Sequence, residues 1–240
     1  MQRKERGWDM TKLIVALDVQ TRAEAEAKVK LIGDAVDFYK IGLELFTAEG
    51  PDVVRAIKGM GKQVFLDLKL HDIPRTVERA VRSAGKLGVD LLTIHASGGR
   101  SMIAAAHEAA SEFGALAPKI LAVTVLTSLD QSDLRDVGVL GLTPGEQVLA
   151  LGAFAVENGA DGLVSSPREV RALYESLPEG TLLVTPGVRP VGSAVGDQKR
   201  VATPGEAVEN GATHLVVGRP VLAAEDPAAA VRAIRAEIGE

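Results

Sequence analysis

The chain of 240 residues contains no cysteine, so neither disulfides nor thiolate metal sites are available to it. It also lacks a run of about 18 apolar residues, the length typical of a membrane-spanning helix. Acidic residues outnumber lysine and arginine, and the net charge of −5 leaves no basic surface for nucleic acid. We therefore expect no membrane and no nucleic-acid partner, and the missing cysteines fit a cytoplasmic location.

The first ten residues, "MQRKERGWDM", lack the apolar stretch of a signal peptide. We expect residues 1–10 to form a disordered tail, with Met10 as an alternative start. The whole chain is 46% hydrophobic and 25% charged, which is ordinary for a globular protein. We predict one domain over residues 11–240.

Apolar runs of strand length recur along this domain, separated by segments of helical periodicity. They cover residues 12–18, 37–42, 63–69, 91–97, 119–126, 161–166, 181–188 and 214–220. Eight strand–helix units in about 230 residues predict a (β/α)8 TIM barrel. A doubly wound open sheet is the alternative, but no G-x-G-x-x-G follows the first strand, and eight even units favour closure.

Local signals mark where the helices begin and end. "TPGE" at 143–146 and 203–206, and "SPRE" at 166–169, predict capped helix starts with proline at the first helical position. Glycines in "LGVDLL", "NGADGL" and "NGATHL" predict helix ends, each followed by a short turn into the next strand.

The third strand, within "FLDLKLHDIP" (65–74), places charges among leucines. Side chains alternate along a strand, so Phe65, Asp67 and Lys69 share one face and the leucines take the other. The charged pair is then expected to point to the barrel axis near its C-terminal end, where barrel enzymes carry their active sites. A structural salt bridge at the barrel mouth is the alternative.

Other strands also end in polar or turn residues, which the barrel brings to the same mouth. They are Asp18, Lys40, Thr127, Pro186, Gly218 and Arg219. Plain alternatives exist here too: Asp18 could cap the next helix, Lys40 could reach to solvent along the surface, and Gly218 could serve turn chemistry alone.

The segment "LDLKLHDIPRTV" (66–77) resembles the D-x-K-x-x-D-I-P signature of the orotidine 5′-monophosphate decarboxylase family. Further matches follow in order: "ALD" (16–18), "FYKIG" (38–42), "VLTS" (125–128), "TPGVRP" (185–190) and "VVGRP" (216–220). The resemblance implies a carboxy-lyase of pyrimidine biosynthesis that converts orotidine monophosphate to uridine monophosphate and CO2. It also implies that no metal or organic cofactor takes part.

The resemblance assigns roles to the charged residues of this signature. Lys69 is the implied proton donor, and Asp67 lies beside the leaving carboxylate. Lys40 and Asp72 complete an alternating lysine–aspartate array with them. Asp72 and Thr76 are implied to reach the site of a partner subunit, so a homodimer is expected.

Substrate contacts follow from the same resemblance. Asp18 and Lys40 are implied to bind ribose hydroxyls, and Thr127 and Ser128 to face the pyrimidine beside Pro186. The implied phosphate ligands are Arg189, Gln198, Gly218 and Arg219. The glycine-rich loop between 189 and 198 is expected to close over ligand, although it lacks a tyrosine that many relatives carry there.

The residues also allow two alternative functions. A metal-dependent sugar-phosphate barrel is one, but Lys40 puts a positive charge where such relatives tend to place a metal ligand. A non-catalytic nucleotide-binding barrel is the other, and it predicts a broken lysine–aspartate array. His95 ends the fourth strand without a second ligand at metal-binding spacing, so we expect it to support the core.

Overall fold

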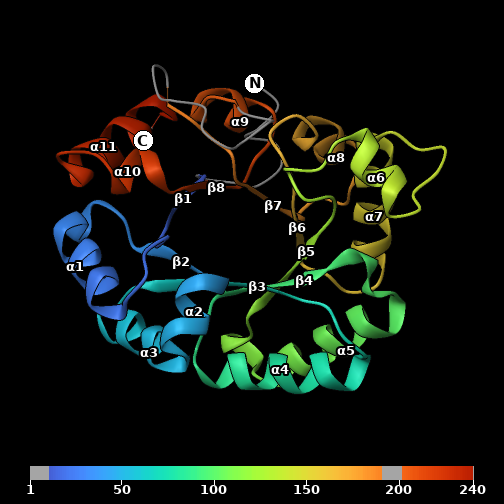
Figure 1. The fold of residues 1–240 in the computed structure, drawn as a ribbon, viewed down its shortest axis with the longest axis horizontal. Helices are drawn as coiled ribbons and strands as arrows, with labels where there is room; N and C mark the ends of the chain where they lie inside the picture. The colour runs from blue at the N-terminus through green and yellow to red at the C-terminus, as the bar shows by residue number, and fades with distance from the viewer. Residues whose placement is uncertain (1–10, 191–201, 240) are drawn as a thin grey trace.

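The computed structural model describes residues 11–190 and 202–239. Eight parallel strands close into a barrel in the order of the sequence, with the helices packed outside (Figure 1). The strands are β1 Lys12–Ala16, β2 Phe38–Gly42, β3 Gln63–Leu70, β4 Leu91–His95, β5 Lys119–Val123, β6 Gly162–Val164, β7 Leu182–Thr185 and β8 His214–Val217. The predicted (β/α)8 barrel is confirmed. Most strands end earlier than the apolar runs, whose last residues enter the loops of the barrel mouth.

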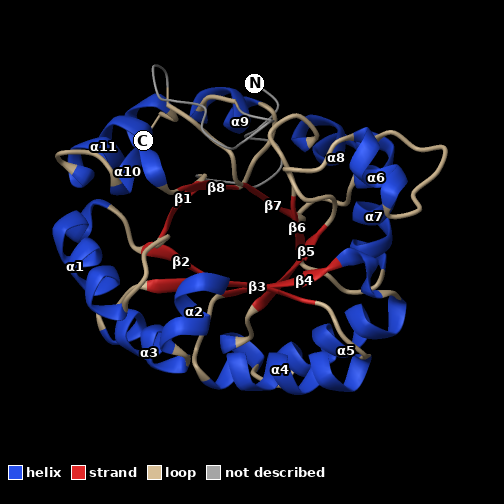
Figure 2. Ribbon diagram, viewed as in Figure 1, coloured by secondary structure: helices blue, strands red, loops and turns tan. Residues whose placement is uncertain are grey.

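The helices form a ring around the strands (Figure 2). They are α1 Arg22–Ile32, α2 Leu43–Glu49, α3 Pro51–Gly59, α4 Pro74–Lys86, α5 Arg100–Ser111, α6 Gln131–Asp136, α7 Pro144–Glu157, α8 Val170–Ser176, α9 Pro204–Glu209, α10 Arg219–Leu222 and α11 Pro227–Glu237. No helix within residues 11–190 or 202–239 is long and apolar enough to cross a membrane.

The predicted helix starts are confirmed at two of the three proline motifs. Thr143 and Thr203 each cap a helix, and in both cases the glutamate three residues later completes a capping box. The prediction at "SPRE" is wrong, because α8 begins only at Val170. The Ser166 hydroxyl donates to the carboxylate of Glu169 and caps no backbone N–H, so the segment forms a turn.

The predicted helix ends depend on left-handed glycines. Gly88, Gly159 and Gly211 have φ angles of 74°, 105° and 103°, a region that costs glycine no steric strain. Each one reverses the chain between a helix and the following strand, as the sequence predicts.

Two apolar clusters lie on the two sides of the barrel wall. The inner cluster fills the lower lumen with one or two side chains from most strands: Ile14, Ala16, Phe38, Phe65, Leu91, Leu121, Val184 and Val216. The outer cluster joins the opposite faces of the strands to the helices. This layer separates the upper lumen from the amino end of the barrel, and barrel enzymes carry their ligand sites above it, at the carboxyl ends of the strands.

One strand pair departs from regular geometry, and it is the pair that carries the charges. Leu66 of β3 lies opposite Leu92 of β4, and Leu70 lies opposite Ile94. Three residues of β3 therefore face one residue of β4 between these pairs. Such a bulge re-aims side chains, and bulges are over-represented next to active sites.

Candidate active site

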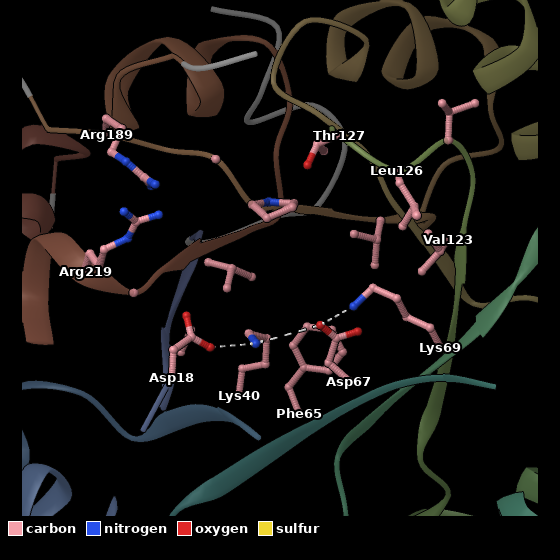
Figure 3. A pocket seen from close by; sticks show the side chains of 17 residues that line it. Asp18, Lys40, Phe65, Asp67, Lys69, Val123, Leu126, Thr127, Arg189 and Arg219 are labelled. Atoms are coloured by element: carbon pink, nitrogen blue, oxygen red, sulfur yellow. Dashed lines mark hydrogen bonds and ion pairs between the residues drawn. The ribbon is translucent and has the colours of Figure 1, made fainter. Parts of the chain in front are cut away.

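A cavity of about 260 Å³ opens at the carboxyl ends of the strands (Figure 3). Its walls come from β1, β2, β3, β5, β6, β7 and β8 and the loops that follow them. The residues predicted from sequence that line it are Asp18, Lys40, Asp67, Lys69, Thr127, Pro186, Arg189, Gly218 and Arg219. The structure thus brings together residues that are up to 201 positions apart in the chain, counting from 18 to 219.

Four of these side chains form a row of alternating charge across the cavity floor (Figure 3). Lys40 Nζ lies 3.2 Å from Asp18 Oδ1 and 3.8 Å from Asp67 Oδ2. Lys69 Nζ lies 2.8 Å from the same Asp67 oxygen. The Asp67 side chain is only 12% exposed, so two ammonium groups offset the cost of burying its charge.

A buried threonine holds the other oxygen of Asp67. The Thr93 hydroxyl donates to Asp67 Oδ1 at 3.0 Å and accepts the backbone N–H of Lys69 at 2.8 Å. Sequence reasoning missed Thr93, because a single threonine in an apolar strand carries no signal that separates it from an ordinary core residue.

Two arginines lie on the other side of the cavity from Asp67 and Lys69. Arg189 follows β7 and Arg219 begins α10 after β8, and Figure 3 shows their guanidinium groups side by side. Burial lowers the pKa of Arg189, and the positive charge of Arg219 lowers it further. Arg189 also donates to the carbonyl of Val188 at 2.9 Å. Two adjacent guanidinium groups form a site suited to a doubly charged anion.

Gly218 lies close to Asp18 in the cavity wall. A Cβ atom at this position would lie 2.9 Å from Asp18 Oδ2. Glycine therefore lets the β8–α10 turn pass directly beside the carboxylate. Gly218 directly precedes Arg219 and is the N-cap residue of α10.

The remaining wall is apolar and was not singled out from the sequence. It consists mainly of Val123, Val125, Leu126, Val164 and Val216. The cavity thus combines a charged row, two arginines and an apolar wall. This combination suits a flat ring that carries anionic groups.

Several predicted residues do not reach this cavity in the single chain. Asp72 and Thr76 are exposed, and Asp72 accepts the backbone N–H of Ile73 at 2.7 Å. Ser128 is also exposed and does not line the cavity, in contrast to its neighbour Thr127. Gln198 and most of the predicted loop, residues 191–201, lie outside the described residues.

His95 ends β4 near the charged row and stacks at a tilt on His71, with 5.3 Å between ring centroids. Burial lowers the pKa of His95, and the neighbouring His71 and Lys69 lower it further. No group of three or more histidine or acidic side chains within residues 11–190 and 202–239 is arranged to hold a metal.

Comparisons with known proteins agree with the charged signature. The profile of the Orotidine 5'-phosphate decarboxylase / HUMPS family matches residues 11–234. The orotidine 5'-phosphate decarboxylase of Moorella thermoacetica is 52% identical over 232 residues, covering 95% of this chain and 92% of that protein. That of Anaeromyxobacter sp. is 53% identical over 225 residues, covering 94% and 97%.

A solved structure shares the whole fold. The crystal structure of orotidine 5'-phosphate decarboxylase from Lactobacillus acidophilus superimposes with a TM-score of 0.86 at 40% identity. The match covers 96% of this chain and 100% of that one. The chain therefore belongs to the orotidine 5'-phosphate decarboxylase / HUMPS family.

Proposed function

We propose that this protein decarboxylates orotidine 5′-monophosphate to uridine 5′-monophosphate and CO2, with residues 11–240 acting as one catalytic domain. The observation that carries the proposal is the row Asp18–Lys40–Asp67–Lys69, which shares one cavity with Arg189 and Arg219. The substrate offers a phosphate for the arginines, ribose hydroxyls for Asp18 and Lys40, and a ring carboxylate for the far end of the row.

In the proposed reaction Lys69 is the acid. The bond between the ring and its carboxylate breaks, CO2 leaves, and the electron pair stays on the ring carbon. That carbon then takes a proton from the Lys69 ammonium group, which Asp67 holds at 2.8 Å. The ammonium group can stabilise negative charge on the carbon before the proton moves.

Asp67 is proposed to lie beside the substrate carboxylate and to repel it. Two like charges 4 Å apart repel by about 4 kcal/mol at an effective dielectric constant near 20. Enzymes lower barriers by roughly 8–23 kcal/mol, so repulsion alone is too small. We assign the larger share to the ammonium groups of the row, which are already oriented when charge develops on the ring.

The phosphate is proposed to bind between Arg189 and Arg219, beside the backbone of Gly218. An anion there would relieve the repulsion of two neighbouring cations, one of them partly buried. This contact lies away from the reacting carbon, so its binding energy can hold the ring against Lys69. Gln198 is proposed as a further phosphate ligand, and Thr127 and Ser128 as contacts of the pyrimidine beside Pro186.

A homodimer is proposed to complete the site with Asp72 and Thr76 of the partner chain. A second, smaller cavity of about 110 Å³ borders Lys40, Asp67 and Lys69 and is lined by Leu43. Leu43 and Ile73 are 54% and 68% exposed, so each offers apolar surface that a partner chain could cover. Mixing the inactive variants Lys69→Ala and Asp72→Ala would restore activity if the sites are shared, and would not if each chain works alone.

The proposed function is tested by the absorbance change on conversion of orotidine monophosphate to uridine monophosphate, with EDTA present. We expect turnover that survives the chelator. Lys69→Ala should abolish it, and Lys86→Ala, which removes an exposed lysine far from the cavity, should not. Absence of turnover in folded wild-type protein would contradict the proposal and redirect the search to sugar phosphates with magnesium.

A further inference from the structure

We propose that Thr93 is a positioning residue for the reaction, because its one hydroxyl fixes both Lys69 and Asp67. The inference rests on the proposed function and extends it to a residue outside the cavity lining. It starts from the bulge in β3, where Asp67, Leu68 and Lys69 lie opposite Thr93 alone.

The bulge forces an unusual backbone on Lys69. Its φ angle is 51°, and in the described part of the chain it is the one residue other than glycine with positive φ. Residues with a Cβ atom are disfavoured in this left-handed region, so the surrounding structure must hold Lys69 there. Strained backbone of this kind concentrates at active sites.

The bulge also takes the Lys69 N–H away from the regular strand ladder. A buried backbone N–H needs an acceptor, and here the acceptor is Thr93 Oγ1 at 2.8 Å. A threonine at this place therefore compensates for the hydrogen bond that the irregular ladder does not supply. Its branched side chain has few rotamers, so the oxygen is held in place.

The same hydroxyl has one hydrogen to donate, and it donates it to Asp67 Oδ1 at 3.0 Å. The other oxygen of Asp67 contacts Lys69 Nζ at 2.8 Å. Thr93 thus holds the backbone of Lys69, and it holds the carboxylate that its ammonium group touches. Thr93 Oγ1 therefore contacts the Lys69 backbone directly and its ammonium group indirectly, through Asp67.

Bulk water does not reach this hydroxyl in the folded protein. Thr93 is fully buried, at 0% exposure, beneath the charged row. Its loss would leave the Lys69 N–H without its acceptor and would remove the contact that holds Asp67 Oδ1, with only the lysine contacts to Oδ2 left to orient the carboxylate. Since displacements of about 1 Å can cost 100-fold in rate, we expect the turnover number to suffer more than substrate binding.

The chain offers a matched control at the opposite end of the barrel. Thr213 is also buried, at 5% exposure, and its hydroxyl accepts the backbone N–H of Leu183 at 2.9 Å. It bridges two strands as Thr93 does, but it lies beside the start of β8, far from the cavity lining. Thr213→Val therefore imitates the structural part of the change in Thr93→Val.

The experiment measures kcat, KM, uridine monophosphate binding and thermal midpoint for Thr93→Val, Thr93→Ser, Thr93→Ala and Thr213→Val. We expect kcat to fall about 10- to 100-fold in Thr93→Val, with KM and product binding within threefold of wild type. Thr93→Ser keeps the hydroxyl and should stay within threefold of the wild-type kcat. Thr213→Val should lower the thermal midpoint without lowering kcat.

Other results would overturn the inference. A folded Thr93→Val with wild-type kcat would do so, as would an equal fall of kcat in Thr93→Val and Thr213→Val. If Thr93→Val does not fold, the comparison of serine with alanine decides: equal kcat values contradict a role for the hydroxyl. An inactive wild-type protein would instead contradict the proposed function itself.

Discussion

Asp67 is the residue on which the candidate site depends. Its two oxygens contact Lys40, Lys69 and Thr93, which come from three different strands. The D-x-K signature identifies two of the four groups, since Asp67 and Lys69 are two positions apart in the sequence. Lys40 and Thr93 belong to neighbouring strands, and only their register with β3 brings them to the carboxylate.

The close approach of Gly218 to Asp18 can be tested by substitution. In Gly218→Ala the new methyl group would lie 2.9 Å from Asp18 Oδ2, closer than a carbon and an oxygen normally approach. Asp18 is 56% exposed and can move, so we expect its carboxylate to shift away from Lys40 and the fold to persist. Losing one charge-assisted contact should raise KM about tenfold.

Steady-state kinetics would check this expectation, with Gly145→Ala as the control. A Cβ atom at Gly145 meets nothing within 4 Å, so that variant should keep the wild-type KM. An unchanged KM in Gly218→Ala would show that the position of Asp18 does not govern substrate binding.

At the scale of elements, the helix caps separate two motifs that look alike in the sequence. "TPGE" at 143–146 caps α7, whereas "SPRE" at 166–169 forms a turn before α8. Both hydroxyls donate to the glutamate three residues later, but the N–H of Glu146 bonds the Thr143 hydroxyl, whereas the N–H of Glu169 bonds the backbone carbonyl of Ser166. The cap motif in the sequence therefore does not by itself fix where the helix begins.

Thr143→Ala should destabilise the protein through α7. It removes an N-cap that accepts a backbone N–H, and such caps contribute about 1 kcal/mol. Urea unfolding would measure the loss in the free energy of unfolding. Ser83→Ala is a suitable control, because its exposed hydroxyl only bonds back to the carbonyl of Arg79 within α4. A loss in both variants of the same size would contradict a specific role of the cap.

At the scale of the whole molecule, the two ends of the barrel are built for different tasks. The carboxyl end carries the charged row and the cavity, and it contains the strained backbone of Lys69. At the amino end, His214 is buried at 5% exposure, packs edge-on against Phe38 and bonds Thr213. The packing of His214 on Phe38 links β8 to β2 at that end, and Thr213 bonds Leu183 of β7, so we assign these contacts to stability.

The buried His214 predicts a pH dependence of stability. Burial lowers its pKa from 6.5 to about 4, and the nearby Lys12 adds to the effect. Below pH 6.5 the unfolded chain binds a proton at this histidine that the folded chain does not. Stability should therefore fall as the pH drops from 6.5 to 4, by at most about 3 kcal/mol.

Denaturant unfolding at pH 7.5, 5.5 and 4.5 would test this for wild type and His214→Asn. The variant cannot titrate here, so its stability should decline less over the same interval. His95, whose pKa is also lowered, contributes a similar decline in both proteins and cancels in the comparison. Equal declines would contradict the assignment to His214.

The eight-unit barrel and the side of the barrel that carries the site follow from local features of the sequence. Strand-length apolar runs, left-handed glycines such as Gly159 and the alternation of Phe65, Asp67 and Lys69 act over a few residues, so they can be read without the fold. Asp67 and Lys69 were placed on one face in the same way, because their spacing within β3 is a property of one segment, whereas Asp72 and the roles came from the family resemblance.

Other features of the candidate site depend on contacts between segments that are distant in the sequence. The bulge opposite Thr93, the pairing of Arg189 with Arg219 and the turn at Ser166 depend on which segments meet in space. The family resemblance named both arginines, but no local pattern marks the bulge or the turn, since a threonine in a strand looks the same whether it faces leucine or a carboxylate. Strand register and loop packing are settled only when the barrel closes, because closure fixes every neighbour of every strand at once.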